Sequence, residues 1–330
     1  IHDNRKAAII LLYIAYVAKI NLHKHVEILN HSVYPKDNLS IDNKLLILTE
    51  NDHDTLSIYK LVYNTIDFFA IREPISAKIM LETMQRNSIT EAVLPLVAFD
   101  CMPIYIKNNY ISLKPDKQFC KKLIIAGSAA WAVNINNLTL EINEDIEQLT
   151  ISDSKGNYKK FIDIIKYFTF YLKDMAGDGF EIIFLIAGNT DVAHTAKDDQ
   201  IFKQYLENKL SDLIKLEKFK VYCAQSLDDW LRCIEEASLL ISGRFHHSIA
   251  AACLGTSFIA FNSNTPKVEG LCMLLDVIDN FINYHDPKLL TKLYDRTKVL
   301  LNNPLILEPK NTTQKLADLA MKNFRNLKKL

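Results

Sequence analysis

The chain has 330 residues, of which 49% are hydrophobic and 24% are charged. Its length predicts two domains, and its composition excludes a disordered, collagen-like or coiled-coil protein. Lys and Arg together number 39, as do Asp and Glu, so the formal net charge is zero. This balance argues against a nucleic-acid-binding protein, whose surface needs an excess of basic residues, but it is compatible with a local basic site for a small anion.

Glycine is scarce, with 8 residues in the chain and none before Gly127. The glycine-rich loops that hold phosphate in dinucleotide-binding and P-loop proteins are therefore excluded from the first 126 residues. The six cysteines form neither a CxxC pair nor a zinc-ligand spacing. This pattern favours free thiols in a reducing compartment, and hence a cytoplasmic protein.

An apolar run of 12 residues, 7–18, follows Arg5 and Lys6. It is too short to span a bilayer as a helix. Basic residues before an apolar run are typical of a signal peptide, but this run contains Tyr13 and Tyr16 and no clear cleavage site follows it. We therefore expect a buried helix.

Helix and strand patterns alternate in the first hundred residues. Helices are expected over residues 6–19, 54–63 and 74–84, strands over 26–30 and 68–72, and a further apolar run covers 93–99. The segment from Lys107 to Asp116 contains two asparagines and a proline, which is typical of a linker. The predicted domains are therefore residues 1–106 and 107–330.

The second domain has a clearer alternation. Strands are expected over residues 122–126, 182–187, 219–223, 239–242 and 258–261, and helices over 158–172, 199–213, 227–237, 245–254, 268–275, 287–301 and 312–329. The strands are apolar along their whole length, which is typical of a parallel sheet covered by helices on both faces. The fold class is therefore α/β, with a Rossmann-like doubly wound second domain.

Residues 239–249 join one of these strands to the following helix. Ser242 and Gly243 form the predicted turn, and Arg244, Phe245 and His246 open the helix. Ligands of parallel sheets bind where strands end and helices begin, so a guanidinium, an imidazole and backbone N–H groups would converge on an anion there. The alternative is a surface arginine and a histidine in an ordinary first helical turn.

Two further basic residues lie in comparable positions. Lys267 begins a helix after the next strand, and Arg72 ends the expected strand 68–72. The alternative for Lys267 is a solvated lysine at a helix start, and for Arg72 it is a salt bridge to Glu73. No His, Cys, Asp or Glu residues have the spacing of metal ligands, so no metal is expected.

Three blocks of sequence together resemble the polysaccharide pyruvyl transferase family. The first block is similar to a family loop of the form Q-S-I-G-P and reads Asn30-His31-Ser32-Val33-Tyr34-Pro35. The second is similar to V-R-D/E-x-x-S and reads Phe69-Ala70-Ile71-Arg72-Glu73-Pro74-Ile75-Ser76. The third extends from Ile241 to Leu271 and is similar to S-x-R-x-H, G-x-P-x-I-A and K-V-x-G. The chain departs from this pattern at Tyr34, Phe245 and Ser257, where the family has glycine, leucine and proline, and it lacks the family's glycine-rich opening.

The resemblance implies a GT-B-like fold, in which two Rossmann-like doubly wound domains face a cleft, with the first domain incomplete in this chain. It implies a transferase that moves pyruvyl from phosphoenolpyruvate, the donor substrate, onto two hydroxyls of a sugar to form a ketal, without a cofactor. The acceptor would be a surface polysaccharide or glycan precursor, or a lipid-linked glycan at a membrane. The expected catalytic residues are His246 and Arg244, and the expected substrate-binding residues are Arg72, Arg244, Phe245, Lys267 and Ser242.

Two alternatives stay open. A nucleotide-sugar glycosyltransferase of the same architecture would need an acidic residue for the ribose in the second domain, and Glu269 is the nearby candidate. A degenerate, non-catalytic member would bind a glycan or a partner protein. The presence of Arg72, Arg244 and His246 argues against this second alternative, whereas the missing glycine-rich opening favours it.

Overall fold

The computed structural model describes residues 5–32, 65–86, 96–112, 120–127, 157–186, 203, 206–262, 266–283, 286–303 and 307–326. The chain divides into two compact units. Unit 1 contains residues 1–108, 265–274 and 313–330, and unit 2 contains residues 109–264 and 275–312. The predicted boundary after residue 106 is close to the first of these divisions, but two later segments that the sequence analysis assigned to the second domain belong to unit 1.

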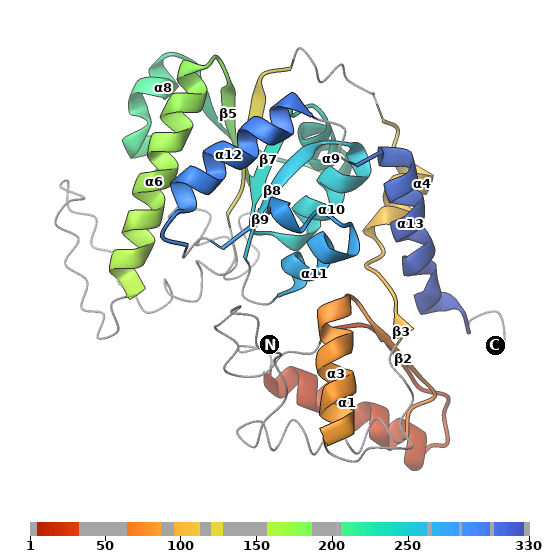
Figure 1. Cartoon of the computed structure of the whole chain (residues 1–330). Helices are drawn as coiled ribbons and strands as arrows, with labels where there is room; N and C mark the ends of the chain where they lie inside the picture. The colour runs from red at the N-terminus through yellow and green to blue at the C-terminus, as the bar shows by residue number, and fades with distance from the viewer. Residues whose placement is uncertain are drawn as a thin grey trace. The chain divides into compact units, whose positions relative to one another are not determined.

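Unit 1 is built on a small parallel sheet, in the order β1-β2-β3 (Figure 1). Its strands are β1 (Glu27–His31), β2 (Phe68–Ile71) and β3 (Leu96–Val97), and its first helices are α1 (Arg5–Ile20), α3 (Pro74–Arg86) and α4 (Met102–Asn109). β2 is the central strand and is buried along its whole length. Phe69 and Ile71 of β2 form the core with Ile79 and Met80 of α3.

The two later segments join unit 1 through specific contacts. α11 (Lys267–Leu274) packs on α3. After α13 (Pro309–Met321), the buried carboxamide of Asn323 accepts a hydrogen bond from the Asn30 N–H at 3.2 Å and donates to the Phe99 and Ala320 carbonyls at 2.8 and 3.0 Å. These contacts are long-range in sequence, which is why the sequence pattern alone placed both segments in the second domain.

Unit 2 contains a six-stranded, fully parallel sheet in the order β6-β5-β4-β7-β8-β9. The strands are β4 (Lys122–Ile125), β5 (Glu181–Ile186), β6 (Phe219–Cys223), β7 (Leu239–Ser242), β8 (Ser257–Phe261) and β9 (Phe281–Ile282). Numbered within the unit, this order is 3-2-1-4-5-6, the order of the Rossmann fold. The predicted doubly wound parallel sheet is therefore confirmed.

Helices cover both faces of this sheet (Figure 1). They are α6 (Asn157–Gly177), α8 (Ser211–Lys215), α9 (Leu227–Glu235), α10 (Phe245–Leu254) and α12 (Leu289–Asn302). α6 and α12 pack together over a core that includes Leu123, Ile125, Leu239 and Ile241. The alternate strand residues point to the opposite face of the sheet. These residues are equally buried, because α9 and α10 pack together over that face. Burial on both faces explains why these strands are apolar throughout.

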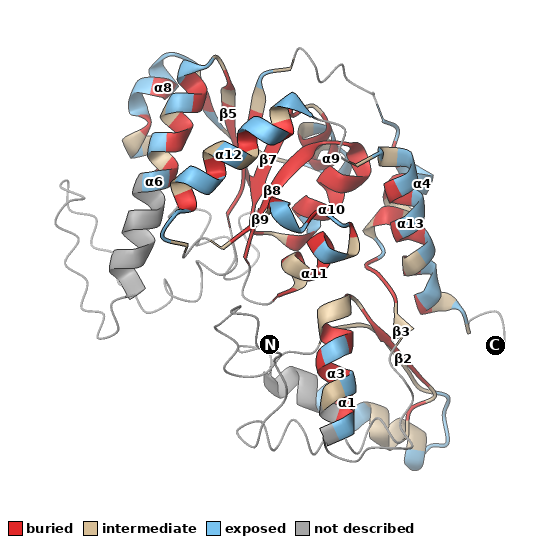
Figure 2. Ribbon diagram, viewed as in Figure 1, coloured by how far each residue is buried: buried red, intermediate tan, exposed pale blue. Residues whose placement is uncertain are grey.

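Three predictions need correction or lie outside the described residues. Residues 102–109 form a helix, although the predicted linker begins at Lys107, and the predicted helix 54–63 lies outside the described part of the chain. The apolar run near the start is helical but not buried, because Ile10, Leu11 and Ile14 are exposed (Figure 2). Only one narrow side of α1, which includes Leu12, packs on the core of unit 1.

Candidate anion-binding site

The junction between β7 and α10 lies at the point where the strand order of unit 2 changes direction. β4 and β7 are neighbours at the centre of the sheet, and the chain continues from β4 to one side and from β7 to the other. Their carboxyl ends are tied together, since the Ala126 N–H donates to the Ile241 carbonyl at 3.0 Å and the Gly243 N–H donates to the Gly127 carbonyl at 3.3 Å. Doubly wound folds bind their ligands at this switch point.

Ser242 shapes the turn that presents Arg244. Its side chain is fully buried, and its hydroxyl accepts a hydrogen bond from the Arg244 N–H at 3.0 Å. Arg244 is extended, with φ −99° and ψ 128°, and stands at the N-cap of α10. Its carbonyl accepts the Ser248 N–H at 3.3 Å, which begins the helix. Ser242 therefore acts on the backbone of the turn, beneath the half-buried Arg244.

The charge at the start of α10 is the reverse of that at an ordinary helix start. The amino end of a helix carries a partial positive charge and favours acidic or capping side chains. α9 follows this rule, because Ser226 caps it and Asp228 and Asp229 lie in its first turn. α10 has no acidic residue in its first turn, and Arg244 at its N-cap makes no side-chain capping bond. Such a start is stabilised when an anion binds to it.

Two adjacent histidines of α10 lie in different environments. His246 is exposed, and its ring contacts the edge of the buried Phe245 ring at a centroid distance of 5.7 Å. His247 is buried, lies 5.0 Å from the Trp230 ring, and has no hydrogen-bond partner for either ring nitrogen. Burial, with smaller effects from Arg244 and His246, holds the pKa of His247 well below its usual value. Of these two histidines, His246 is the one whose side chain is accessible to a ligand.

In unit 1, Arg72 follows β2 directly and is half-buried. Its backbone N–H donates to the His31 carbonyl at 2.8 Å. Its guanidinium Nε and Nη2 both donate to the Ser32 hydroxyl, at 3.2 and 3.0 Å. Burial and the Arg72 charge together lower the pKa of His31 to about 4, so this imidazole is neutral at physiological pH. The carboxyl end of β2 thus has one fixed cation beside a neutral histidine.

Lys267, the other predicted basic site residue of unit 1, lies on α11, which packs on α3 through the contact between Glu73 and Gly270. Both oxygens of the buried Glu73 carboxylate accept the Ser76 N–H, at 3.1 and 3.0 Å, so Glu73 caps α3. A Cβ on Gly270 would lie 2.7 Å from Glu73 Oε2, which explains a glycine there. Lys267 is the half-buried first residue of this helix, α11. The burial of Glu269 and the charge of Glu73 raise the pKa of Glu269.

The predicted site residues are divided between the two units. Ser242, Arg244, Phe245 and His246 lie together in unit 2, while Arg72 and Lys267 belong to unit 1. Ser32 is not among the predicted site residues, because its contact with Arg72 joins positions 40 residues apart in the sequence. The carboxyl end of β4 was also missed, since only the strand order shows that it adjoins β7.

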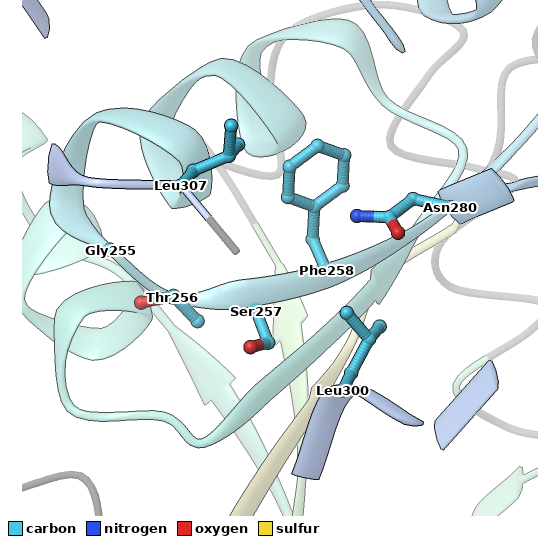
Figure 3. A pocket seen from close by; sticks show the side chains of 7 residues that line it. All are labelled: Gly255, Thr256, Ser257, Phe258, Asn280, Leu300 and Leu307. Atoms are coloured by element: carbon cyan, nitrogen blue, oxygen red, sulfur yellow. The ribbon is translucent and has the colours of Figure 1, made fainter. Parts of the chain in front are cut away.

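Two other kinds of site receive no support among the described residues. No three His, Cys, Asp or Glu side chains there lie close enough to hold a metal ion. A small pocket of unit 2 has about 10 Å³ of space, enough for one water molecule. It lies at Gly255, Thr256 and Ser257, where β8 begins, and so at the opposite edge of the sheet from Arg244 (Figure 3).

Comparison with known families identifies the family to which the chain belongs. A family model for polysaccharide pyruvyl transferase matches residues 47–265, about two thirds of the chain. The chain belongs to the polysaccharide pyruvyl transferase family. The match contains Arg72, Ser242, Arg244, Phe245 and His246, and ends before Lys267. No curated protein sequence matches this member of the family.

Solved structures show the fold of this pyruvyl transferase family member. It resembles a UDP-forming α,α-trehalose-phosphate synthase from Burkholderia xenovorans, with a TM-score of 0.52 and 9% identity over 96% of this chain and 72% of that chain. It also resembles the E. coli trehalose-6-phosphate structure bound with UDP-2-fluoro glucose, with a TM-score of 0.51 and 10% identity over 95% and 68% of the two chains. These are GT-B glycosyltransferases, so the predicted GT-B-like fold of two Rossmann-like domains is confirmed.

None of the helices in the described part of the chain has the length and apolar character of a bilayer span.

Proposed function

We propose that this family member transfers the pyruvyl group of phosphoenolpyruvate to two hydroxyls of one sugar in a surface polysaccharide or glycan precursor. Membership of the family supports a transferase that acts on polysaccharide. The observation that carries the choice of donor is the start of α10, where Arg244 stands at the N-cap, His246 is exposed in the first turn, and no acidic residue is present in that turn. Phosphoenolpyruvate is a small, highly charged anion, and such a site favours it.

The reaction conserves atoms in two steps. In the first, one sugar hydroxyl adds to C2 of phosphoenolpyruvate while the methylene carbon gains a proton and becomes a methyl group. In the second, the other hydroxyl attacks the same carbon, the bond from C2 to the phosphate oxygen breaks, and inorganic phosphate leaves with a proton. The two protons lost by the hydroxyls balance those gained by the methylene and the phosphate.

The residues of unit 2 have distinct roles in this proposal. Arg244 binds the carboxylate or phosphate with two parallel N–H donors, which a guanidinium supplies and an ammonium does not. His246, which is exposed beside it, donates the proton to the methylene or to the departing phosphate. Ser242 is buried and acts through the turn, and Phe245, which is also buried, would meet a ligand through its backbone N–H. Arg72 and Lys267 of unit 1 are the remaining substrate-binding residues of the proposal.

The nucleotide-sugar alternative loses its proposed ribose ligand. The sequence analysis placed Glu269 in the second domain, but α11 belongs to unit 1. The burial of Glu269 and the charge of the Glu73 carboxylate also raise the pKa of Glu269. A comparison of donor substrates distinguishes the two functions directly.

The first experiment titrates the full chain with phosphoenolpyruvate and, separately, with UDP-glucose by calorimetry. We expect phosphoenolpyruvate alone to bind and to release inorganic phosphate when a suitable sugar acceptor is present. Binding of UDP-glucose without phosphoenolpyruvate would refute the proposal in favour of a glycosyltransferase. Binding of a glycan acceptor without turnover of either donor would instead identify a non-catalytic member.

Two variants then separate binding from catalysis. Arg244→Lys keeps the charge but loses the paired donors, so we expect phosphoenolpyruvate binding to weaken by roughly tenfold or more. His246→Ala should keep binding and slow phosphate release by about 100- to 10,000-fold, the usual contribution of a positioned general acid. Arg232→Lys in the last turn of α9 is the matched control and should change neither. A wild-type rate for His246→Ala would remove this residue from catalysis.

A further inference from the structure

The hydroxyl group of Ser32 contacts the Arg72 guanidinium at two of its nitrogens. Nε and Nη2 of Arg72 both donate to Ser32 Oγ, at 3.2 and 3.0 Å. Two donors on one side edge of the planar group fix its rotation about the side-chain axis. A guanidinium can hold an anion through its Nε–Nη2 side edge or through its Nη1–Nη2 end. Because Ser32 occupies the side edge, a two-pronged contact with an anion would use the end.

The backbone before Ser32 is irregular in a way that directs this hydroxyl toward Arg72. β1 and β2 pair regularly from Glu27, but the register shifts between Ile28 and His31. Asn30, within this shift, has a φ of 53°, a left-handed conformation that is uncommon for residues other than glycine. Bulges of this kind redirect side chains and are frequent beside active sites.

Two hydrogen bonds hold the bulge in place. The Asn30 N–H donates to the buried Asn323 carboxamide at 3.2 Å. Beyond the bulge, the His31 carbonyl accepts the Arg72 N–H at 2.8 Å. The end of β1 is therefore connected to Arg72 through its backbone as well as through the Ser32 hydroxyl. A local strain that is supported on both sides points to a function for the conformation it maintains.

We propose that Ser32 is a positioning residue, which the bulge at Asn30 directs to orient the Arg72 guanidinium end-on toward an anionic group of the substrate. This inference rests on the proposed function, in which Arg72 is one of the substrate-binding residues. Ser32 itself does not contact the substrate. Its loss affects substrate binding through Arg72 and leaves the proton transfer by His246 unchanged.

A kinetic experiment measures this effect. Ser32→Ala should raise the KM for phosphoenolpyruvate by roughly tenfold, the contribution of a hydrogen bond to a charged group, and leave kcat within about twofold because the group acts in binding. Ser32→Thr keeps the hydroxyl and should restore the KM. In an Arg72→Gln background, Ser32→Ala should have no further effect, because the residue that it orients is absent. An equal rise in KM in both backgrounds would overturn the inference.

A second measurement needs no ligand. The Arg72 Nε–Hε signal in a nitrogen-15 NMR spectrum, assigned by its loss in Arg72→Lys, reports hydrogen bonding of this proton. We expect exchange with solvent to be roughly tenfold faster in Ser32→Ala, as for a lost hydrogen bond, and equally fast in Ser32→Cys, which keeps the side-chain volume. Ser76→Ala, four residues after Arg72, is the matched control and should leave the exchange rate unchanged.

The two measurements separate the failure of each idea. Faster exchange in a protein that does not bind phosphoenolpyruvate would refute the proposed function and leave the positioning role of Ser32 intact. Normal exchange and a normal KM in Ser32→Ala, in a protein that turns over phosphoenolpyruvate, would refute the role of Ser32 alone.

Discussion

Replacement of His247 by phenylalanine tests the electrostatics next to the candidate site. The imidazole is buried against Trp230, and neither ring nitrogen has a hydrogen-bond partner. Its pKa is held well below the usual value, chiefly by burial. His247 is therefore neutral in the folded protein at a pH at which it would take up a proton in the unfolded chain.

This difference makes the stability of unit 2 depend on pH with a definite sign. Above pH 6.5 the imidazole is neutral in both states and contributes no pH dependence. As the pH falls below 6.5, the unfolded state binds a proton that the folded state does not, so the free energy of unfolding decreases. Each pH unit below 6.5 costs about 1.4 kcal/mol, so the loss from this residue between pH 7.5 and pH 5 is at most about 2 kcal/mol, the value for an imidazole that stays neutral in the folded state.

Urea unfolding followed by tryptophan fluorescence measures this loss. Both tryptophans, Trp131 and Trp230, fall within the sequence of unit 2, so their signal follows that unit. His247→Phe should unfold within about 1 kcal/mol of the wild type at pH 7.5, because it removes two unpartnered polar atoms at little cost in volume. At pH 5 it should be up to about 2 kcal/mol more stable, relative to the wild type, than at pH 7.5.

A matched control separates this effect from a general change in stability. Val299 lies in α12 of the same unit and is exposed, and the control variant is Val299→Gly. It carries no titratable group, so it should lower the stability by the same amount at both pH values. If the wild type and His247→Phe lose stability equally between pH 7.5 and pH 5, His247 takes up its proton in the folded state and the argument from burial is wrong.

Two further predictions concern unit 1. Gly270→Ala would place a Cβ 2.7 Å from the buried Glu73 carboxylate, so we expect a loss of about 1–3 kcal/mol from overpacking; a melting temperature equal to that of the wild type would contradict this contact. Asn323→Ala removes three hydrogen bonds to backbone groups and should cost about 3 kcal/mol, because buried partners lose their bonds. Limited proteolysis should then cleave the C-terminal segment faster than in Asp318→Ala, an exposed control on the preceding helix, and equal cleavage rates would refute the role of Asn323.

Most of unit 2 could be predicted from the sequence because its strands have a simple and distinctive pattern. Each strand is a short apolar run between helical patterns, and a sheet buried on both faces produces that signal directly. The Ser242–His246 junction was predicted for the same reason, since it lies between a complete strand and a complete helix. The order of the strands could not be predicted from the sequence, because the pairing of β4 with β7 joins residues more than a hundred positions apart. Without that order, the switch point could not be located.

The errors in unit 1 have separate physical causes. The asparagines at 108 and 109 suggested that a linker begins at Lys107, but residues 102–109 are helical. α11 was assigned by its neighbours in sequence, whereas its packing is decided by the absence of a side chain at Gly270 facing Glu73. The exposure of Ile10 and Leu11 depends on which side of α1 meets the core, which the uniform apolar run does not indicate.

The two family motifs with an arginine differ in what they place at the start of the next helix. After Arg72, Glu73 neutralises and caps the amino end of α3, so this helix start cannot also hold an anion. After Ser242 and Gly243, Arg244 itself takes the N-cap of α10, and no acidic residue follows in the first turn. In the Arg72 motif, Glu73 thus caps the helix and the arginine side chain contacts Ser32. In the Arg244 motif, the arginine adds its positive charge to the amino end of the helix. This difference in charge at a single helix position is why we assign the donor anion to α10 and give α3 a structural role.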